Sequence, residues 1–174
     1  MTSDLVFFDK MPSTWEKIAE YVAPSDVTNI DFTGLDINED GFYVLFFHVK
    51  NPAGANAALY LFVEGDYTAT NYYCQYLRGD GTTVSGNRVN NPTIGYVFSG
   101  ETVNGIVYIY RDVDGYFRYL TLFSYKPAAS IRVEIRAGAK TAPVSNITQL
   151  RVHATVAGAI GEGSRFILCR VRTK

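Results

Sequence analysis

The C-terminal stretch, residues 145–174, reads SNITQLRVHATVAGAIGEGSRFILCRVRTK and decides the fold. It contains two runs of β-type residues, 147–155 and 165–172, separated by a glycine-rich connector at 156–164. In the first run, Leu150 and the apolar residues that follow it at every second position alternate with polar ones, a period typical of a half-buried strand. Glycine tolerates the backbone angles that a chain reversal requires. We therefore expect two antiparallel strands paired as a hairpin.

Short β-type segments of the same kind recur upstream of this hairpin. Turn-forming sequences such as Asp-Gly and Asn-Pro separate them, because these residues suit the backbone angles of a bend. We expect further strands at residues 15–22, 27–35, 42–49, 58–63, 72–77, 93–98, 102–111, 116–125 and 131–136. The first of these segments is also compatible with a helical turn, whereas residues 112–115 predict a tight hairpin turn.

The number and spacing of these segments indicate the fold class. About ten short strands at intervals of about 8–12 residues are typical of sandwiches and barrels. Neither a long helix nor an internal repeat is visible in the sequence. We expect an all-β fold, an antiparallel β-sandwich of the jelly-roll type, formed by residues 15–174 as one domain. A short N-terminal arm, residues 1–14, precedes it.

The composition fits one strand-rich domain. With 174 residues, the chain is long enough to bury about 70% of its unfolded surface without help from a metal or a disulfide. Thirteen tyrosines contribute to an aromatic content of 14%, while charged residues make up only 19%. A tyrosine ring packs well in a sheet, and its hydroxyl also suits an interface or a sugar-binding surface. The packed sheet is the simpler interpretation.

Cysteine usage and hydropathy indicate the compartment. Cys74 and Cys169 each lie in an expected strand and are interpreted as buried free thiols. The first ten residues carry acids and only a short apolar run, so they lack the features of a secretion signal. No run approaches the roughly eighteen apolar residues of a membrane span. We expect a soluble protein made in a cytoplasm, with no membrane partner.

Charge is distributed unevenly, although the formal net charge is only −1 and gives no reason to expect a nucleic-acid partner. Residues 1–125 hold 7 Lys/Arg against 15 Asp/Glu, and residues 126–174 hold 9 against 2. Either the two parts interleave within one sandwich, or acidic and basic faces of neighbouring subunits meet. Interleaving is favoured, because segments distant in sequence are commonly neighbours in all-β folds.

The longest irregular segment is residues 78–92, which consist mainly of Gly, Asp, Thr, Ser and Asn. This composition predicts an exposed loop, and loops of this length in compact domains tend to be functional or mobile. We expect a partner or receptor contact here. The candidate contact residues are Arg78, Asp80, Thr82, Asn87, Arg88 and Asn90.

One segment matches the first half of a calcium-binding loop. Asp36, Asn38 and Asp40 are spaced two apart and Gly41 follows, as in an EF-hand. The twelfth position, where a bidentate Glu belongs, is Phe47 within an expected strand. An acidic β-turn is therefore the better interpretation, and we expect no metal site.

The remaining motifs indicate neither catalysis nor a cofactor. Arg78-Gly79-Asp80 is the tripeptide that integrins read, but three residues in a turn carry little information. His48 and His153 have no partner at a metal-ligand spacing and are interpreted as structural. No sequence resembling a nucleophile elbow occurs. We expect no catalytic residues and no cofactor.

The C-terminal segment of residues 147–171 resembles the closing segment of a group of tailed-phage virion proteins. Similar phrases occur at Trp15-Glu16, IDFTGLD at 30–36, Asp40-Gly41, TNYY at 70–73 and YRDVDG at 110–115. The resemblance spans residues 15–171, but these phrases are structural turns and strands rather than a catalytic signature. It implies a trimeric β-sandwich protein that is associated with the capsid or the tail and decorates the particle or contacts the host. Residues 1–14 lie outside it and would form an attachment arm.

These observations lead us to expect a non-enzymatic virion structural protein that self-associates, binds other capsid or tail proteins, and assembles in the host cytoplasm. The alternative is a carbohydrate- or receptor-binding module on the virion surface, with Tyr72, Tyr76 and Tyr96 as stacking residues for a host glycan. A third hypothesis is a polysaccharide hydrolase, which needs two suitably spaced carboxylates in a groove. Its candidate carboxylates are Asp31, Asp36, Glu64 and Asp66.

Overall fold

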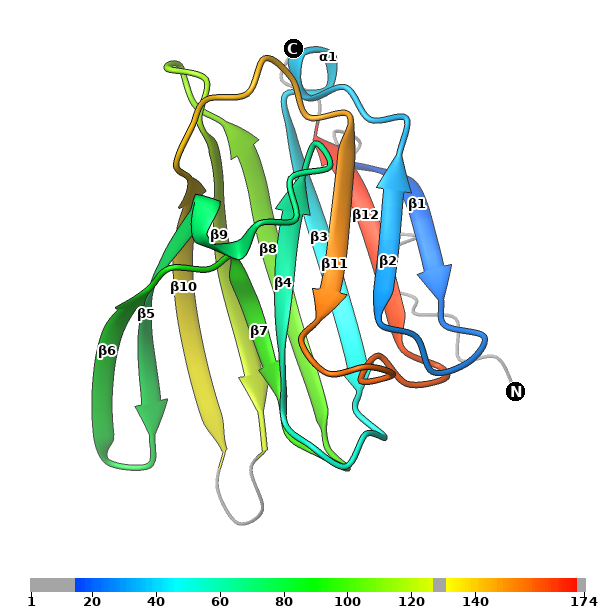
Figure 1. Cartoon of the computed structure of the whole chain (residues 1–174), viewed down its shortest axis with the longest axis vertical. Coiled ribbons are helices and arrows are strands. Elements are labelled where there is room, and N and C mark those ends of the chain that lie inside the picture. The colour runs from blue at the N-terminus through cyan, green and yellow to red at the C-terminus, as the bar shows by residue number, and fades with distance from the viewer. Residues whose placement is uncertain (1–14, 127–130, 172–174) are drawn as a thin grey trace.

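The computed structural model describes residues 15–126 and 131–171, which form an antiparallel β-sandwich (Figure 1). The expected all-β fold is confirmed. The expected N-terminal arm at residues 1–14 lies outside the described residues. The elements are β1 (Trp15–Val22), β2 (Asn29–Thr33), α1 (Ile37–Asp40), β3 (Phe42–Lys50), β4 (Ala57–Val63), a 3-10 turn (Ala69–Asn71), β5 (Tyr72–Asp80), β6 (Thr83–Val89), β7 (Thr93–Val97), β8 (Thr102–Arg111), β9 (Phe117–Tyr125), β10 (Arg132–Lys140), β11 (Gln149–Ala154) and β12 (Arg165–Val171).

The strands form two sheets of unequal size. The large sheet has eight strands in the order β1-β12-β3-β8-β9-β10-β5-β6, and the small sheet has four in the order β2-β11-β4-β7. Neighbouring strands are antiparallel throughout both sheets. In Figure 1 the small sheet lies in front of the large one, and the large sheet extends to the left beyond it. Because of this difference in width, part of the inner face of the large sheet is not covered by the small sheet.

The hydrophobic core fills the space between the two sheets. Alternate residues of facing strands point inward, among them Leu45, Leu61, Val107, Val152 and Leu168, each of which is fully buried. Their alternation with more exposed residues is the period-two pattern that predicted strands from the sequence.

Most expected strands are confirmed within a few residues of their predicted ends. Residues 15–22 form strand β1 rather than a helical turn. The Asp-Gly turn at residues 112–115 joins β8 to β9 as a hairpin, with Gly115 at a positive φ of 87°. Cys74 and Cys169 are free and buried, as predicted.

The expected C-terminal hairpin is wrong. β11 belongs to the small sheet, where it pairs with β2 and β4, whereas β12 belongs to the large sheet and pairs with β1 and β3. The connector between them crosses from one sheet to the other and is held by backbone hydrogen bonds from Gly161 to Lys50 and from Gly163 to Ala23. Both strands bury their apolar residues in the core that the two sheets share. The apolar alternation is therefore the same whether the two strands pair with each other or lie in opposite sheets.

The expected irregular loop at residues 78–92 is also wrong. Most of it forms a hairpin, because β5 continues to Asp80 and pairs with β6 through a two-residue turn. Gly81 begins this turn with a φ of 59°, which glycine adopts without strain. β6 lies at the edge of the large sheet and is largely solvent-exposed on both faces, so its sequence shows no apolar alternation to mark it as a strand.

The two oppositely charged parts of the chain interleave within one molecule, as favoured from the sequence. Cationic residues of the segment after residue 126 form ion pairs with acids that precede it in the chain. These pairs are Arg132 with Asp80, Lys140 with Asp66, Arg151 with Asp31, Arg165 with Glu20, and Arg170 with both Glu16 and Asp40. Across the described ranges, no helix has the length and apolar character needed to cross a membrane.

Candidate ligand-binding groove

A groove forms where the large sheet extends beyond the edge of the small one. The small sheet ends at β7, while the large sheet continues through β10, β5 and β6. The side of β10 and β5 that would otherwise be covered by the small sheet therefore lies open beside β7. We call this hollow the β7–β10 groove; its cavity has a volume of about 400 Å³. Its lining residues come mainly from β5 and β10 of the large sheet and from β4 and β7 of the small one, and Figure 1 shows how these strands are arranged.

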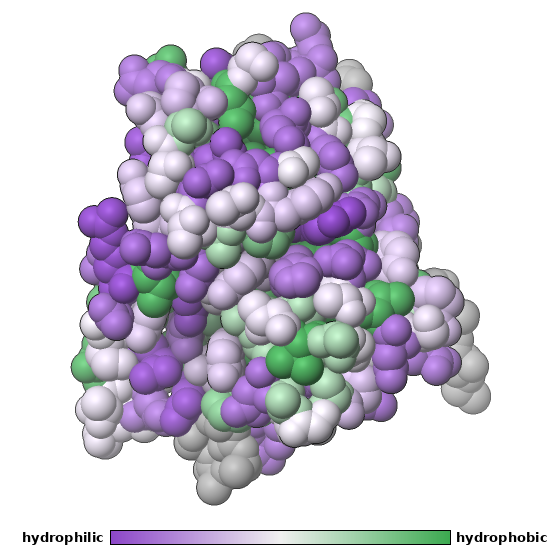
Figure 2. Space-filling view, in the orientation of Figure 1, coloured by the Kyte–Doolittle hydropathy of each residue, from purple (hydrophilic) through white to green (hydrophobic). Residues whose placement is uncertain are grey.

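Charged and aromatic side chains line the β7–β10 groove. The charged residues are Arg78 from β5 and Arg132, Glu134 and Arg136 from β10. The aromatic residues are Tyr60, Tyr76, Tyr96, Phe98 and Tyr125. Figure 2 shows this side of the molecule, where hydrophilic residues predominate and apolar ones form smaller areas. Such a combination of aromatic surface with a few convergent polar groups is typical of small-ligand sites.

The alternation along β10 places its charges inside and its apolar residues outside. Glu134 and Arg136 are only 1% and 7% exposed, whereas Val133 and Ile135 are 46% and 48% exposed. The alternation in this segment predicted a half-exposed strand, and that prediction is confirmed. The inward direction of its polar residues follows from the position of β10 beyond the edge of the small sheet, where the inner face meets the groove.

Glu134 is held by two hydrogen bonds at the bottom of the groove. The hydroxyl of Tyr125 donates to its Oε1 over 2.7 Å, and the guanidinium of Arg136 donates to its Oε2 over 2.6 Å. Burial, together with the neighbouring carboxylate, raises the pKa of Tyr125 to about 12. The Tyr125 hydroxyl is therefore protonated at neutral pH and acts as a donor.

The three arginines are the neighbours of Glu134 on the same face of the sheet, as the strand register shows. Arg132 and Arg136 lie two residues before and after Glu134 on β10, and Arg78 is its direct partner on β5. Arg132 forms an ion pair with Asp80 over 2.6 Å. The guanidinium of Arg136 lies 4.6 Å from the ring centre of Tyr76, within the range of a cation–π contact.

Each of these arginines carries an Nε donor with no protein acceptor. The Nε atoms of Arg78, Arg132 and Arg136 are buried and make no hydrogen bond to any described residue. A buried donor left unpaired costs about 1–3 kcal/mol, and native structures contain few of them. Three such unpaired donors on one side of a single groove indicate that its arginines have more hydrogen-bond donors than the protein provides acceptors for.

The residues of the expected receptor loop are separated by the β5–β6 hairpin rather than gathered. Arg78 faces the groove, while Arg88 lies on the opposite face of the sheet with its guanidinium 4.6 Å from the ring centre of Tyr73. Asp80 is bound to Arg132. Thr82, Asn87 and Asn90 are exposed on the hairpin and beyond its end.

The three tyrosines expected to stack on a glycan differ in exposure and position. Tyr72 is fully buried, and its hydroxyl donates to the carbonyl of Asp66 over 2.9 Å, so its assignment as an exposed stacking residue is wrong. Its position at the start of β5, over the core, explains this burial. Tyr76 and Tyr96 both line the β7–β10 groove and are partly exposed there.

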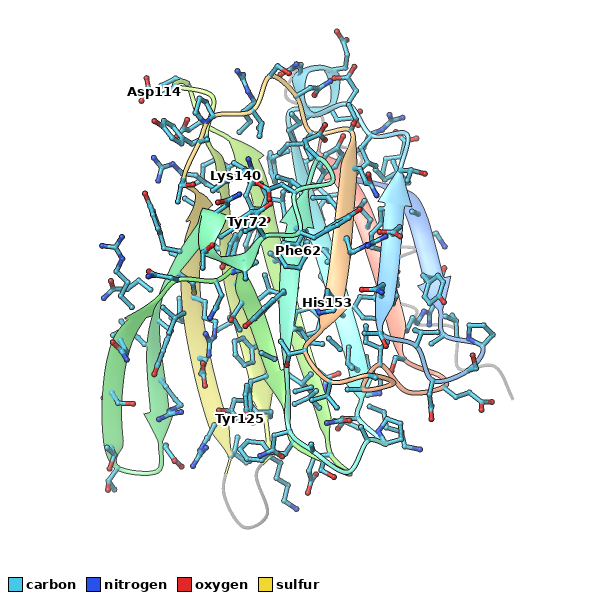
Figure 3. The ribbon with its side chains drawn as sticks, viewed as in Figure 1. Phe62, Tyr72, Asp114, Tyr125, Lys140 and His153 are labelled. Carbon is cyan, nitrogen blue, oxygen red and sulfur yellow. The ribbon has the colours of Figure 1, made fainter. Side chains whose placement is uncertain are left out.

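A second hollow of about 330 Å³ adjoins the first across Tyr60, which lines both. It lies over β4 and β11, where Figure 3 labels Phe62 and His153 side by side. Arg151 lies here with its guanidinium 4.1 Å from the ring centre of Tyr67. Burial and the nearby Arg151 lower the pKa of His153, so its ring is neutral at neutral pH.

The expected calcium-loop segment forms α1 instead of a β-turn. Asp36 is the N-cap of this short helix and accepts hydrogen bonds from the backbone N–H groups of Asn38 and Glu39. Asp40 accepts from Tyr43 and forms an ion pair with Arg170. Within residues 15–126 and 131–171, no group of three or more His, Cys, Asp or Glu side chains is arranged to hold a metal.

The candidate hydrolase carboxylates are each engaged with a different partner. Asp31 pairs with Arg151 and Asp66 with Lys140, while Asp36 caps α1. Glu64 accepts hydrogen bonds from the backbone of Thr148 and Gln149. None of these four residues lines the β7–β10 groove.

Comparisons with known proteins give no further guide to these surfaces. No protein-family model, curated protein or solved structure matches the chain.

Proposed function

We propose that this protein is a non-enzymatic structural module of a virion, which self-associates as a homotrimer through the outer face of its large sheet. In this role it would be carried on the capsid or the tail together with other virion proteins. The observation that carries the proposal is a continuous apolar row on that outer face.

The apolar row crosses four adjacent strands in register. It consists of Ile106 on β8, Leu122 on β9, Ile135 on β10 and Leu77 on β5, each paired directly with the next. Leu122, Ile135 and Leu77 are 47%, 48% and 57% exposed. These residues point away from the sandwich core, so the core does not cover the exposed part of their apolar surface.

Further apolar side chains flank the row on both sides. They include Tyr108, Leu120, Val133 and Val84, all of which are exposed. Monomeric proteins rarely expose apolar patches larger than a few hundred Å², and larger ones commonly mark interaction sites. Covering such a patch would gain about 25 cal/mol for each Å² of apolar surface removed from water.

A second copy of the chain is the partner that this face fits best. The apolar row contains no charged residue; of the cations near it on this face, Arg118 is bound to Asp112, and Arg88 lies over the ring of Tyr73. The apolar rows of neighbouring copies can therefore meet around a threefold axis without like-charge repulsion between the residues of the row. A partner of strongly charged chemistry would instead require unpaired charges of opposite sign on this face.

The strand order supports the virion part of the proposal. We take strands β1-β12-β3-β8 of the large sheet and β2-β11-β4-β7 of the small one as the eight strands of a jelly roll, with β5, β6, β9 and β10 as additions. Jelly rolls are common among viral capsid and lectin domains. The resemblance of residues 147–171 to tailed-phage virion proteins agrees with this interpretation.

The proposal is tested by changing the apolar row and measuring molar mass by light scattering. We expect Leu122→Lys to shift the protein toward the monomer, because a charge at the centre of the row opposes its burial. Val113→Lys is the matched control, since Val113 is fully exposed on the β8–β9 turn, away from the row. An oligomer unaffected by Leu122→Lys in a folded protein would contradict the proposed interface.

A further inference from the structure

We propose that the β7–β10 groove binds an acidic saccharide, with a sugar carboxylate held by its arginines and the sugar ring packed on its tyrosines. This site lies beside the small sheet, on the side opposite to the self-association face. The inference is therefore independent of the proposed oligomer.

Charge in the groove favours an anion. Arg132 is neutralised by Asp80, and Arg136 by Glu134, across ion pairs of 2.6 Å. Arg78 completes the set without a carboxylate partner among the residues that the structure describes; its guanidinium lies 6.0 Å from the ring centre of Tyr76. The lining thus carries one positive charge that the protein leaves unneutralised.

Hydrogen-bonding capacity points to a carboxylate. Each guanidinium of Arg78, Arg132 and Arg136 carries five N–H donors, which the ion pairs with Asp80 and Glu134 use only in part. Their Nε atoms are enclosed and unpaired, and Arg136 is more than nine-tenths buried. In the strand register, Arg78 is diagonal to both Arg132 and Arg136, a separation that long side chains can span. A carboxylate has about four acceptor positions, so it can accept from more than one guanidinium at once.

The aromatic wall indicates what the carboxylate is attached to. Tyr96 and Phe98 stand on the small-sheet side of the groove, opposite Tyr76 and the arginines of the large sheet. A tyrosine ring offers an apolar face bordered by a hydroxyl, which suits a sugar ring with its apolar faces and polar rim. The cavity of about 400 Å³ lies within the range of small-ligand sites.

The adjoining hollow extends the site from one sugar to a chain of them. Tyr60 joins the groove to the second cavity, where Arg151 lies over Tyr67. Phe62 and His153, both labelled in Figure 3, line the same cavity. Arg151 is bound to Asp31, so this hollow offers a further sugar ring its aromatic side chains rather than a second unneutralised cation. The geometry thus favours an oligosaccharide that carries a carboxylate over an isolated anion.

Binding to a homogeneous uronic-acid oligosaccharide, measured by titration calorimetry, tests this inference. A neutral glucose oligosaccharide of the same length and inorganic phosphate are the comparison ligands. We expect the uronate oligosaccharide to bind, with affinity falling as salt rises, and the neutral oligosaccharide not to bind. Failure of the uronate to bind, or equal binding of the neutral sugar, would overturn the proposal. Binding of phosphate as tightly as uronate would overturn the saccharide assignment.

Matched arginine variants locate the site. Arg78→Met removes the unneutralised cation without breaking an ion pair, and we expect it to weaken uronate binding by about tenfold or more. Arg88→Met is the control, because Arg88 lies on the other face of the same hairpin. We expect Arg78→Met to leave the molar mass unchanged, which separates this test from that of the oligomer. Equal loss of affinity in both variants, or in neither, would place the ligand elsewhere.

Discussion

At Gly138, the ring of Tyr119 occupies the space that any side chain would need. A Cβ atom there would lie 2.2 Å from the Tyr119 ring, whose residue is almost fully buried. We expect Gly138→Ala to reduce the free energy of unfolding by about 1–3 kcal/mol, because the core would have to shift. Urea denaturation measures this loss. Gly54→Ala, which meets no atom within 4 Å, is the control, and equal midpoints for the two variants would contradict the packing described.

His153 links the stability of the fold to pH. Its pKa in the folded protein is lowered by burial and by Arg151, so the unfolded chain takes up the proton first as pH falls. Stability should therefore decline as pH drops through the usual histidine range near 6.5 toward the lower folded-state value. We expect His153→Gln to reduce this decline in urea midpoints measured between pH 7.5 and 5.5. The control His48→Gln, at an exposed position, should retain it; an unchanged decline in His153→Gln would contradict the account.

Individual residues were predictable from the sequence where local chemistry decides their role. The Asp-Gly turn at 112–115 and the two buried cysteines follow from turn preference and from position within a strand. The burial of Glu134 and Arg136 did not follow, because alternation shows which residues share a face but not which face points inward. The burial of Tyr72 was missed for the same reason.

At the scale of elements, β10 depends on a buried ion pair. Glu134 is 1% exposed and Arg136 7% exposed, and removing one partner leaves the other charge buried and uncompensated. We expect Glu134→Gln and Arg136→Met each to lower the free energy of unfolding by about 3 kcal/mol, and the double variant to lose less than the sum. Urea denaturation of all four proteins measures the coupling. Additive losses would show that the two side chains do not stabilise the strand as a pair.

The elements that the sequence failed to predict share a cause. β6 is an edge strand with polar residues on both faces, so it lacks the apolar alternation that marks a strand. The connector between β11 and β12 crosses between sheets, while its glycines also suit a hairpin. In both cases the local sequence allows two structures, and packing against distant strands selects one.

At the scale of the whole molecule, unequal sheet width creates both proposed surfaces. Four strands added to one side of the large sheet leave its inner face open at the β7–β10 groove and its outer face exposed along the apolar row. The sequence predicted a sandwich, because strand number and spacing determine that class. The sequence could not predict the difference in width between the two sheets. Which sheet a strand joins depends on its pairing with strands that are far away along the chain.

The central claim is that the outer face of the large sheet is covered by further copies of the chain. Sedimentation equilibrium of the full chain at micromolar concentration tests this claim most directly. The account predicts a molar mass of three times 19.3 kDa, with dissociation to a single chain in the Leu122→Lys variant. A mass of 19.3 kDa for the unmodified protein at every concentration would contradict it.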